Sequence, residues 1–229
     1  MAERSAVLDA FASLRVADVR DGMDTLLLHE QGSLSPGIRP LWRTRACGIA
    51  RTVKYVPYEG DVPRLSAEEY WDWVGEYYRE MCPYPWMKEL QDGDFVVIDQ
   101  SGVNAGLMGS ENTLAALRAG ARGLVSNGGV RDTDEVIMQQ VPFWSAFVSQ
   151  GMVQGRLQYA AHNVPVEVGG VTVNPGDVVV ADGDGVIVVP ADRALDVAAY
   201  ADEEHRRDMK RRRALYDDLG RAPDDTVAQ

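Results

Sequence analysis

The residues best suited to chemistry are an arginine and an aspartate that directly follow paired glycines, in Gly128-Gly129-Val130-Arg131-Asp132. An apolar run precedes this stretch, and a helix-like segment opens after it at Thr133. Glycines at a strand-to-helix turn would let the backbone approach a ligand closely. Arg131 can bind a carboxylate through two parallel hydrogen bonds, and Asp132 offers the oxygen ligands that hard divalent cations prefer. The pattern predicts a site for a small anionic substrate held against a metal, with a turn carrying a surface ion pair as the alternative.

The composition narrows the class of protein. The 229 residues are 45% hydrophobic, enough to bury the core of one domain without a stabilising disulfide. A formal net charge of -12 argues against a nucleic-acid partner, which would require a basic surface. Cys47 and Cys82 lack the spacing of a metal or redox pair and are interpreted as free thiols in a reducing compartment. Without a signal-peptide pattern or an apolar run of about 20 residues, a cytoplasmic protein with no membrane partner is expected.

Hydrophobic periodicity predicts the elements that must position these residues. Helices are expected over 5–28, with a second short helix beginning at Asp18, over 66–81, from Ser110, and after Asp192, where a charged C-terminal helix begins. Strands are expected over 47–56, 95–99 and 123–126, at 141–144 as a strand or edge, and across 164–189. Residues 102–109 are expected to form a glycine-containing loop. The pattern favours one α/β domain with a mixed sheet, covering residues 1–229.

Several motifs, taken in order, resemble a known family. They are Val16 to Asp21, Gly37 to Leu41, Gly93 to Asp99, Gly106 to Gly109, Gly128 to Asp132, and Pro175 to Val186. Together they cover roughly residues 14–205 and resemble the regulator-of-ribonuclease-activity-A-like (RraA-like) proteins. That family includes the class II pyruvate aldolases that act on 4-hydroxy-4-methyl-2-oxoglutarate. The resemblance implies a swivelling β/β/α fold assembled as a homotrimer or hexamer, with a site at the subunit interface.

The resemblance also implies roles for individual residues. Arg131 would bind the pyruvyl carboxylate, and Asp132 would ligate Mg²⁺ or Mn²⁺. Backbone N–H groups of a loop would hold the carboxylate too, from Gly106, Leu107, Met108 and Gly109. The metal would polarise the keto oxygen and stabilise an enolate, which serves both aldol cleavage and decarboxylation of oxaloacetate-like acids.

The chain departs from the family pattern at one acidic position. That position lies twenty-one residues before Arg131, where this chain has Ser110, and Glu111 comes one residue later. Glu111 could reach the metal if the loop is shifted by one residue, Ser110 could serve an altered chemistry, or the site could bind without turnover. A purely structural interpretation also fits, with Ser110 as an N-cap and Glu111 as a first-turn acid favoured by the helix dipole.

Other polar groups favour structural interpretations. His29, His162 and His205 show no ligand spacing and are expected at the surface or in loops. Asp182 and Asp184 suit a hairpin turn rather than a cation loop. The basic run 210–213 alternates with acidic residues and is expected to form a solvated or intersubunit helix face.

An aromatic-rich insertion is expected at about 57–86, between two strands. Its centre opens at Ser66 with a capping-box pattern. Tyr70, Trp73 and Tyr77 recur at helical spacing, which is typical of core or interface positions. Large apolar side chains with polar tips would equally suit a lid over a site, so both interpretations stay open.

These observations favour a divalent-metal-dependent lyase, an aldolase or decarboxylase acting on a small 2-oxo carboxylic acid. Arg131 and Asp132 are its candidate catalytic residues. Two alternatives remain: a non-catalytic regulator that binds a protein partner, and a dehydratase or isomerase on the same scaffold. The substrate, and the choice between trimer and hexamer, do not follow from the sequence.

Overall fold

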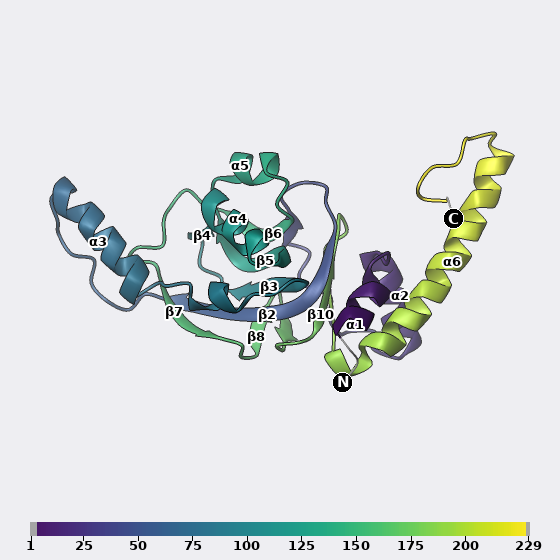
Figure 1. Ribbon diagram of the computed structural model, residues 1–229, viewed down its shortest axis with the longest axis horizontal. Helices are drawn as coiled ribbons and strands as arrows, with labels where there is room; N and C mark the ends of the chain where they lie inside the picture. The colour runs from purple at the N-terminus through teal and green to yellow at the C-terminus, as the bar shows by residue number, and fades with distance from the viewer. Residues whose placement is uncertain (1–3, 228–229) are drawn as a thin grey trace.

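A nine-stranded mixed sheet forms the centre of the computed structural model, which describes residues 4–227 (Figure 1). Its strands are β1 (Arg39–Pro40), β2 (Ala46–Pro57), β3 (Asp94–Asp99), β4 (Gly106–Met108), β5 (Ala121–Val130), β6 (Phe143–Val148), β7 (Leu157–His162), β10 (Val178–Ala181) and β11 (Val186–Val189). Their order is β1-β6-β5-β3-β2-β10-β11, with β4 added to β5 and β7 to β2. Strands β2 to β6 pair in parallel, and the remaining pairs are antiparallel. A separate hairpin joins β8 (Val166–Val168) to β9 (Val171–Val173).

The helices lie around this sheet in three groups. They are α1 (Arg4–Phe11), α2 (Val16–Thr25), α3 (Ala67–Glu80), α4 (Ser110–Arg118), α5 (Thr133–Met138) and α6 (Ala194–Asp218), with short 3-10 helices η1 (Pro85–Glu89) and η2 (Ala191–Arg193). Helices α4 and α5 cover one face of the sheet, and α1, α2 and α6 pack beyond β10. Helix α3 projects from the opposite end of the molecule (Figure 1). No described helix has both the length and the apolar character needed to cross a membrane.

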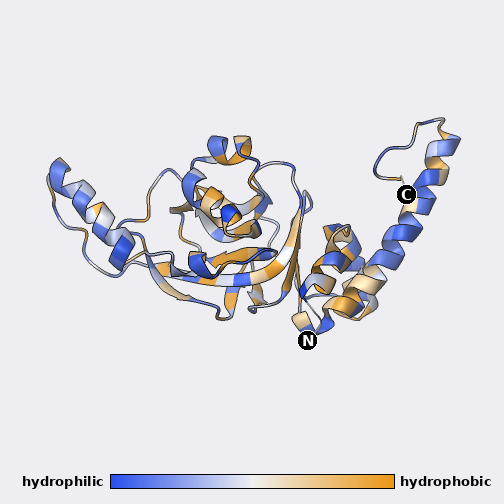
Figure 2. Ribbon diagram, in the orientation of Figure 1, coloured by the Kyte–Doolittle hydropathy of each residue, from blue (hydrophilic) through white to orange (hydrophobic). Residues whose placement is uncertain are grey.

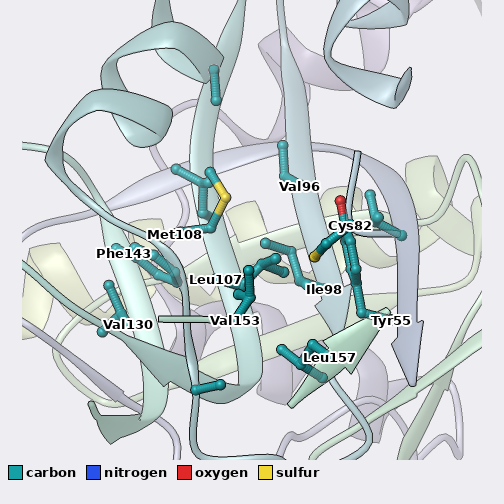
Figure 3. Close-up of a cluster of buried hydrophobic side chains, with 14 of the residues drawn as sticks. Tyr55, Cys82, Val96, Ile98, Leu107, Met108, Val130, Phe143, Val153 and Leu157 are labelled. Carbon is teal, nitrogen blue, oxygen red and sulfur yellow. The ribbon is translucent and has the colours of Figure 1, made fainter. Parts of the chain in front are cut away.

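Strand β3 shows how the sequence builds two hydrophobic layers at once. All six of its residues are buried, as expected for a strand covered on both faces. Val96 and Ile98 join the cluster under α4 and α5 (Figure 3), whereas Phe95 and Val97 join the cluster under β8 and β9. A third cluster holds α1, α2 and α6 against β10 and β11. The α/β fold with a mixed sheet that the sequence predicts is therefore confirmed, and the structure shows that this sheet is curled (Figure 1).

The long helix α6 changes character along its length. Its first turns bury Val197, Ala198 and Ala201, while the outer turns are hydrophilic (Figure 2). There the basic run pairs with acidic residues on the same helix, including Arg212 with Asp208 at 3.3 Å and Arg213 with Asp217 at 3.1 Å. The basic run thus lies on an ion-paired helix face, as expected, and the choice between a solvated and an intersubunit face stays open.

Three sequence-based expectations about local structure were wrong. Strand β5 continues through Gly128, Gly129 and Val130, so the paired glycines lie in a strand and the turn begins at Arg131. Part of the expected 102–109 loop is the strand β4, which gains its regular structure by pairing with β5. Helix α2 begins at Val16 rather than Asp18, whose carboxylate accepts a hydrogen bond from Arg15 N at 2.9 Å.

Other expectations hold. Ser66 and Glu69 form the reciprocal capping box at the start of α3, and Asp182 and Asp184 lie in the turn between β10 and β11. Both cysteines are free, and burial raises the pKa of the Cys82 thiol to about 12. The ends of the expected 1–229 domain lie outside the described residues, and the single domain stays a prediction.

Packing of α2 against α6 depends on a glycine. A Cβ added at Gly22 would lie 2.6 Å from the Val197 carbonyl oxygen. We therefore expect Gly22→Ala to lower the free energy of unfolding in urea by about 1–3 kcal/mol, the usual effect of overpacking. Gly75→Ala in α3 is the matched control, because its nearest neighbour would be Arg79 Nη1 at 3.5 Å. That variant should be neutral or more stable by about 0.5–1 kcal/mol. Equal losses in both variants would contradict the packing argument.

Candidate functional site

Parallel pairing of β4 with β5 assembles the candidate site. Gly106 pairs with Gly129 and Met108 with Val130. The N–H of Arg131 then donates to the Met108 carbonyl oxygen at 3.0 Å. The chain leaves β5 at this point, so Arg131 and Asp132 emerge beside the beginning of α4, which directly follows β4.

Asp132 links two helices. It is the N-cap of α5 with φ 54° and ψ 39°, a left-handed conformation that aspartate tolerates better than most residues. Its Oδ2 accepts a hydrogen bond from Ser110 N at 3.2 Å, at the first residue of α4. Its Oδ1 lies 3.3 Å from Arg131 Nε. Both side chains are about one-third exposed, so the carboxylate and the guanidinium remain accessible to a ligand.

Glycines do permit close approach here, but at positions other than the pair in β5. A Cβ added at Gly106 would lie 2.7 to 2.8 Å from the aliphatic carbons of Arg131, and one added at Gly109 would collide with the Asp132 carboxylate. Gly106 and Gly109 thus let these two side chains lie against the backbone that precedes α4. Gly128 instead accommodates the buried Gln100 side chain.

Two of the four backbone amides expected to hold a carboxylate already donate hydrogen bonds within the protein. The N–H of Gly106 donates to the Gly151 carbonyl at 2.8 Å, and the N–H of Leu107 donates to the Ala105 carbonyl at 2.9 Å. The Leu107 and Met108 side chains are buried in the core under α4 and α5 (Figure 3). Carboxylate binding by the Gly106–Gly109 amides stays a prediction.

A pocket of about 440 Å³ adjoins these residues. Its polar side is formed by Ser110, Glu111, Asn112, Arg131 and Asp132, with Gly106 and Gly109 at its base. Its apolar side is formed by Trp71, Val74, Tyr78, Tyr84, Leu107 and Met152. A larger hollow of about 730 Å³ lies between α1 and the start of α6, and it shares none of these residues. The residues predicted to form the site therefore line the smaller pocket.

Ser110 is not the N-cap that the structural interpretation expects, whereas Glu111 is the first-turn acid that it expects. Helix α4 begins at Ser110, its N-cap is Gly109, and the Ser110 side chain caps nothing. The Asp132 carboxylate occupies the capping place instead. Glu111 is exposed in the first turn and lines the same pocket as Asp132, which keeps open both the dipole role and a role at the metal.

The oxygen donors of the pocket fit a hard divalent cation. No group of three or more His, Cys, Asp or Glu side chains within residues 4–227 is arranged to hold a metal. The pocket offers two carboxylates, from Asp132 and Glu111. Mg²⁺ is commonly bound through one or two carboxylates while keeping several waters and substrate oxygens. This donor set therefore suits Mg²⁺ or Mn²⁺ better than a metal that requires a complete protein cage.

The histidines lie outside the pocket, on separate elements. His29 is exposed in a turn. His162 on β7 hydrogen-bonds to Tyr159 and to Glu89, and His205 on α6 pairs with Asp18 at 2.9 Å. His29 thus lies in a loop as expected, whereas His162 and His205 lie on a strand and a helix and contact neighbouring side chains.

Sequence reasoning missed the tyrosine that connects α3 to β4. The Tyr84 hydroxyl donates to the Leu107 carbonyl at 2.7 Å, and its ring stacks on Tyr78 with centroids 6.4 Å apart. Burial raises the pKa of Tyr84 well above its usual value, so the phenol remains a donor. Its position just before a proline after a helix, in an aromatic-rich segment, carries no signal of this contact.

The two roles of Asp132 can be separated by substitution. Asp132→Asn keeps a side-chain acceptor for Ser110 N and tolerates the left-handed backbone, so stability should change by less than about 0.5 kcal/mol. Asp132→Ala loses both features and should cost about 1–3 kcal/mol in urea unfolding. If Asn and Ala are equally destabilising, the negative charge rather than the cap geometry is what stabilises this turn.

Comparisons with known proteins show the family of this chain. A family model described as RraA-like, Aldolase/RraA, matches residues 16–188. Protein DlpA of Legionella pneumophila is 29% identical over 194 residues, which are 83% of this chain and 28% of DlpA. A Halalkalibacterium halodurans protein named "Putative 4-hydroxy-4-methyl-2-oxoglutarate aldolase" is 29% identical over 134 residues, 58% of this chain and 63% of that protein. The matches thus span less than two thirds of either curated relative.

A solved structure extends the likeness to nearly the whole chain. RraAS2 of Streptomyces coelicolor, described as an unusual member of the RNase ES inhibitor RraA protein family, has a TM-score of 0.72 at 26% identity. The match covers 92% of this chain and 97% of RraAS2. Because the family model spans most of the chain, and the motifs at 106–109 and 128–132 lie within it, this protein belongs to the RraA-like family.

Proposed function

We propose that this protein is a divalent-metal-dependent lyase that cleaves or decarboxylates a small 2-oxo carboxylic acid. The observation that carries the proposal is the contact of Arg131 with Asp132 over the glycines of the β4 segment, inside one pocket. Relatives named as aldolases support lyase chemistry at the level of the family.

Each residue has a distinct task in this proposal. The Arg131 guanidinium binds the substrate carboxylate through paired hydrogen bonds and orients the 2-oxo group. Asp132 and Glu111 supply carboxylate oxygens for Mg²⁺ or Mn²⁺, and the bound ion supplies a Lewis acid at the 2-oxo oxygen. Asp132 is itself held by the N-terminus of α4 through Ser110 N, where the helix dipole favours negative charge.

We also propose assembly as a homotrimer or hexamer, as the resemblance implies. Phe147 and Val148 end β6 beside Gly129 and Val130, and they are 42% and 64% exposed. A neighbouring subunit would cover these apolar side chains next to the pocket. The proposed ligand is a small 2-oxo acid, and neither a nucleic acid nor a membrane is a proposed partner.

The alternative is a non-catalytic regulator, since RraAS2 is described within an RNase-inhibitor family. A protein that only binds another protein has no need of Mn²⁺ beside Arg131. Calorimetric titration with Mn²⁺ distinguishes the two functions, and binding that disappears in Asp132→Asn supports the lyase.

Oxaloacetate should lose carbon dioxide slowly when Mg²⁺ or Mn²⁺ is present, and excess chelator should stop the reaction. Arg131→Ala should lower kcat/KM about 10- to 100-fold, because a charge-assisted hydrogen bond contributes about 1.5–3 kcal/mol. Arg118→Ala is the matched control, as an exposed cation at the far end of α4. Unchanged kinetics in Arg131→Ala, or full activity in chelator, would show that the site is assigned incorrectly.

Glu111→Gln distinguishes the two roles left open for that residue. If Glu111 orients a metal-bound water, activity should fall about 10- to 100-fold. If it only complements the helix dipole, the variant should lose about 0.3–1 kcal/mol of stability and keep its rate. Glu135→Gln, an exposed first-turn acid on α5, controls for the dipole effect. Melting and rate measurements on both variants decide the role, and an unaltered rate removes Glu111 from the site.

A further inference from the structure

Helix α3 carries two adjacent stripes of large apolar side chains, each at helical spacing. One stripe contains Trp73 and Tyr77, whose rings lie 5.4 Å apart. Tyr77 is 1% exposed, and its hydroxyl donates to the Leu157 carbonyl at 2.7 Å. This stripe therefore anchors α3 to the core beside β7.

The other stripe contains Trp71, Val74 and Tyr78, and all three line the pocket of Arg131 and Asp132. Tyr78 stacks on Tyr84, which is hydrogen-bonded to β4. The apolar side of the pocket is thereby tied to β4, the strand against which the Arg131 side chain packs. Trp71 is 67% exposed, although large aromatic side chains contribute most when covered.

The charges of the pocket are unequal. Among its described lining residues, Arg131 is the only cation, whereas Glu111 and Asp132 are both acidic. One substrate carboxylate can pair with Arg131. Asp132 and Glu111 would hold the metal ion in the proposed lyase, so a second carboxylate would find no further cationic side chain among the described lining residues of this chain's pocket.

We propose, resting on the lyase function above, that the preferred substrate is a monocarboxylic 4-hydroxy-2-oxo acid with an aromatic or branched apolar group on C4. Trp71 and Tyr78 determine this specificity by packing on that group. In the reaction the C3–C4 bond breaks and its electron pair stays on C3, which takes up a proton. The C4 hydroxyl loses its proton and becomes the carbonyl of an apolar aldehyde. The other product is pyruvate, and neither oxidant nor reductant is required.

Ligand binding tests the specificity independently of turnover. Phenylpyruvate and 2-oxoglutarate are titrated in the presence of Mg²⁺, with tryptophan fluorescence and calorimetry as readouts. Phenylpyruvate should bind at least about 10-fold more tightly, a difference typical of apolar pockets. Trp71→Ala and Tyr78→Ala should each remove most of this preference while leaving 2-oxoglutarate binding unchanged. Tyr200→Ala, an exposed aromatic on α6, should keep the preference.

Turnover then tests the chemistry. Pyruvate release is measured from 4-hydroxy-2-oxo-4-phenylbutanoate, 4-hydroxy-2-oxopentanoate and 4-hydroxy-2-oxoglutarate, and the phenyl acid should have the highest kcat/KM. Cleavage of none of them, with the binding preference intact, would refute the lyase but keep the apolar specificity of the pocket. Equal or tighter binding of 2-oxoglutarate would overturn the specificity inference. Dissociation of the oligomer in Trp71→Ala would overturn it too, by assigning that side chain to a subunit contact.

Discussion

The site depends on the parallel hydrogen bonding of a three-residue strand to the end of a long one. Met108 pairs with Val130 and accepts a hydrogen bond from Arg131 N. The two residues after β5 therefore lie over Gly106, which begins β4, and Gly109, which follows it. This one strand pairing brings the Arg131 guanidinium, the Asp132 carboxylate and the N-terminus of α4 close together. Side chains at Gly106 or Gly109 would force these groups apart without touching the strand order. The chemistry therefore rests on backbone geometry more than on any one side-chain contact.

Electrostatics at the start of α4 explains why an acidic protein can present an anion site. Asp132 takes the place of a helix cap, so its charge is held by Ser110 N and balanced by Arg131. Arg131 in turn is supported along its carbon chain by β4, which leaves its polar edge for a ligand. A formal net charge of -12 matters less than this arrangement, since short-range pairing dominates the field inside a pocket.

Local signals in the sequence were sufficient for some of this arrangement and insufficient for the rest. The capping box at Ser66 follows from short-range chemistry and was predicted. The start of α4 at Ser110 was predicted too, but the group that caps it, Asp132, is distant in the sequence. The extension of β5 through Gly129 was not, because glycine favours turns locally and only the neighbours β4 and β6 make it part of a strand. The two stripes of α3 show the same limit. Trp71 and Trp73 both have large side chains at helical spacing from them, so the sequence does not show which stripe packs on the core. The contact of Tyr77 with Leu157, which is distant in the sequence, decides it.

The attachment of α3 has a consequence for how such proteins diversify. The helix is joined to the body near its C-terminal end, through Tyr77 and Tyr84, while its N-terminal half projects away from the sheet (Figure 1). Substitutions at the exposed Trp71 can therefore accumulate without disturbing the strands that hold Arg131. In the proposed lyase, α3 would recognise the tail of the substrate, and the segments that carry Arg131 and Asp132 would handle its reactive end. New specificities could then arise by substitution in one segment while the other preserves the reaction.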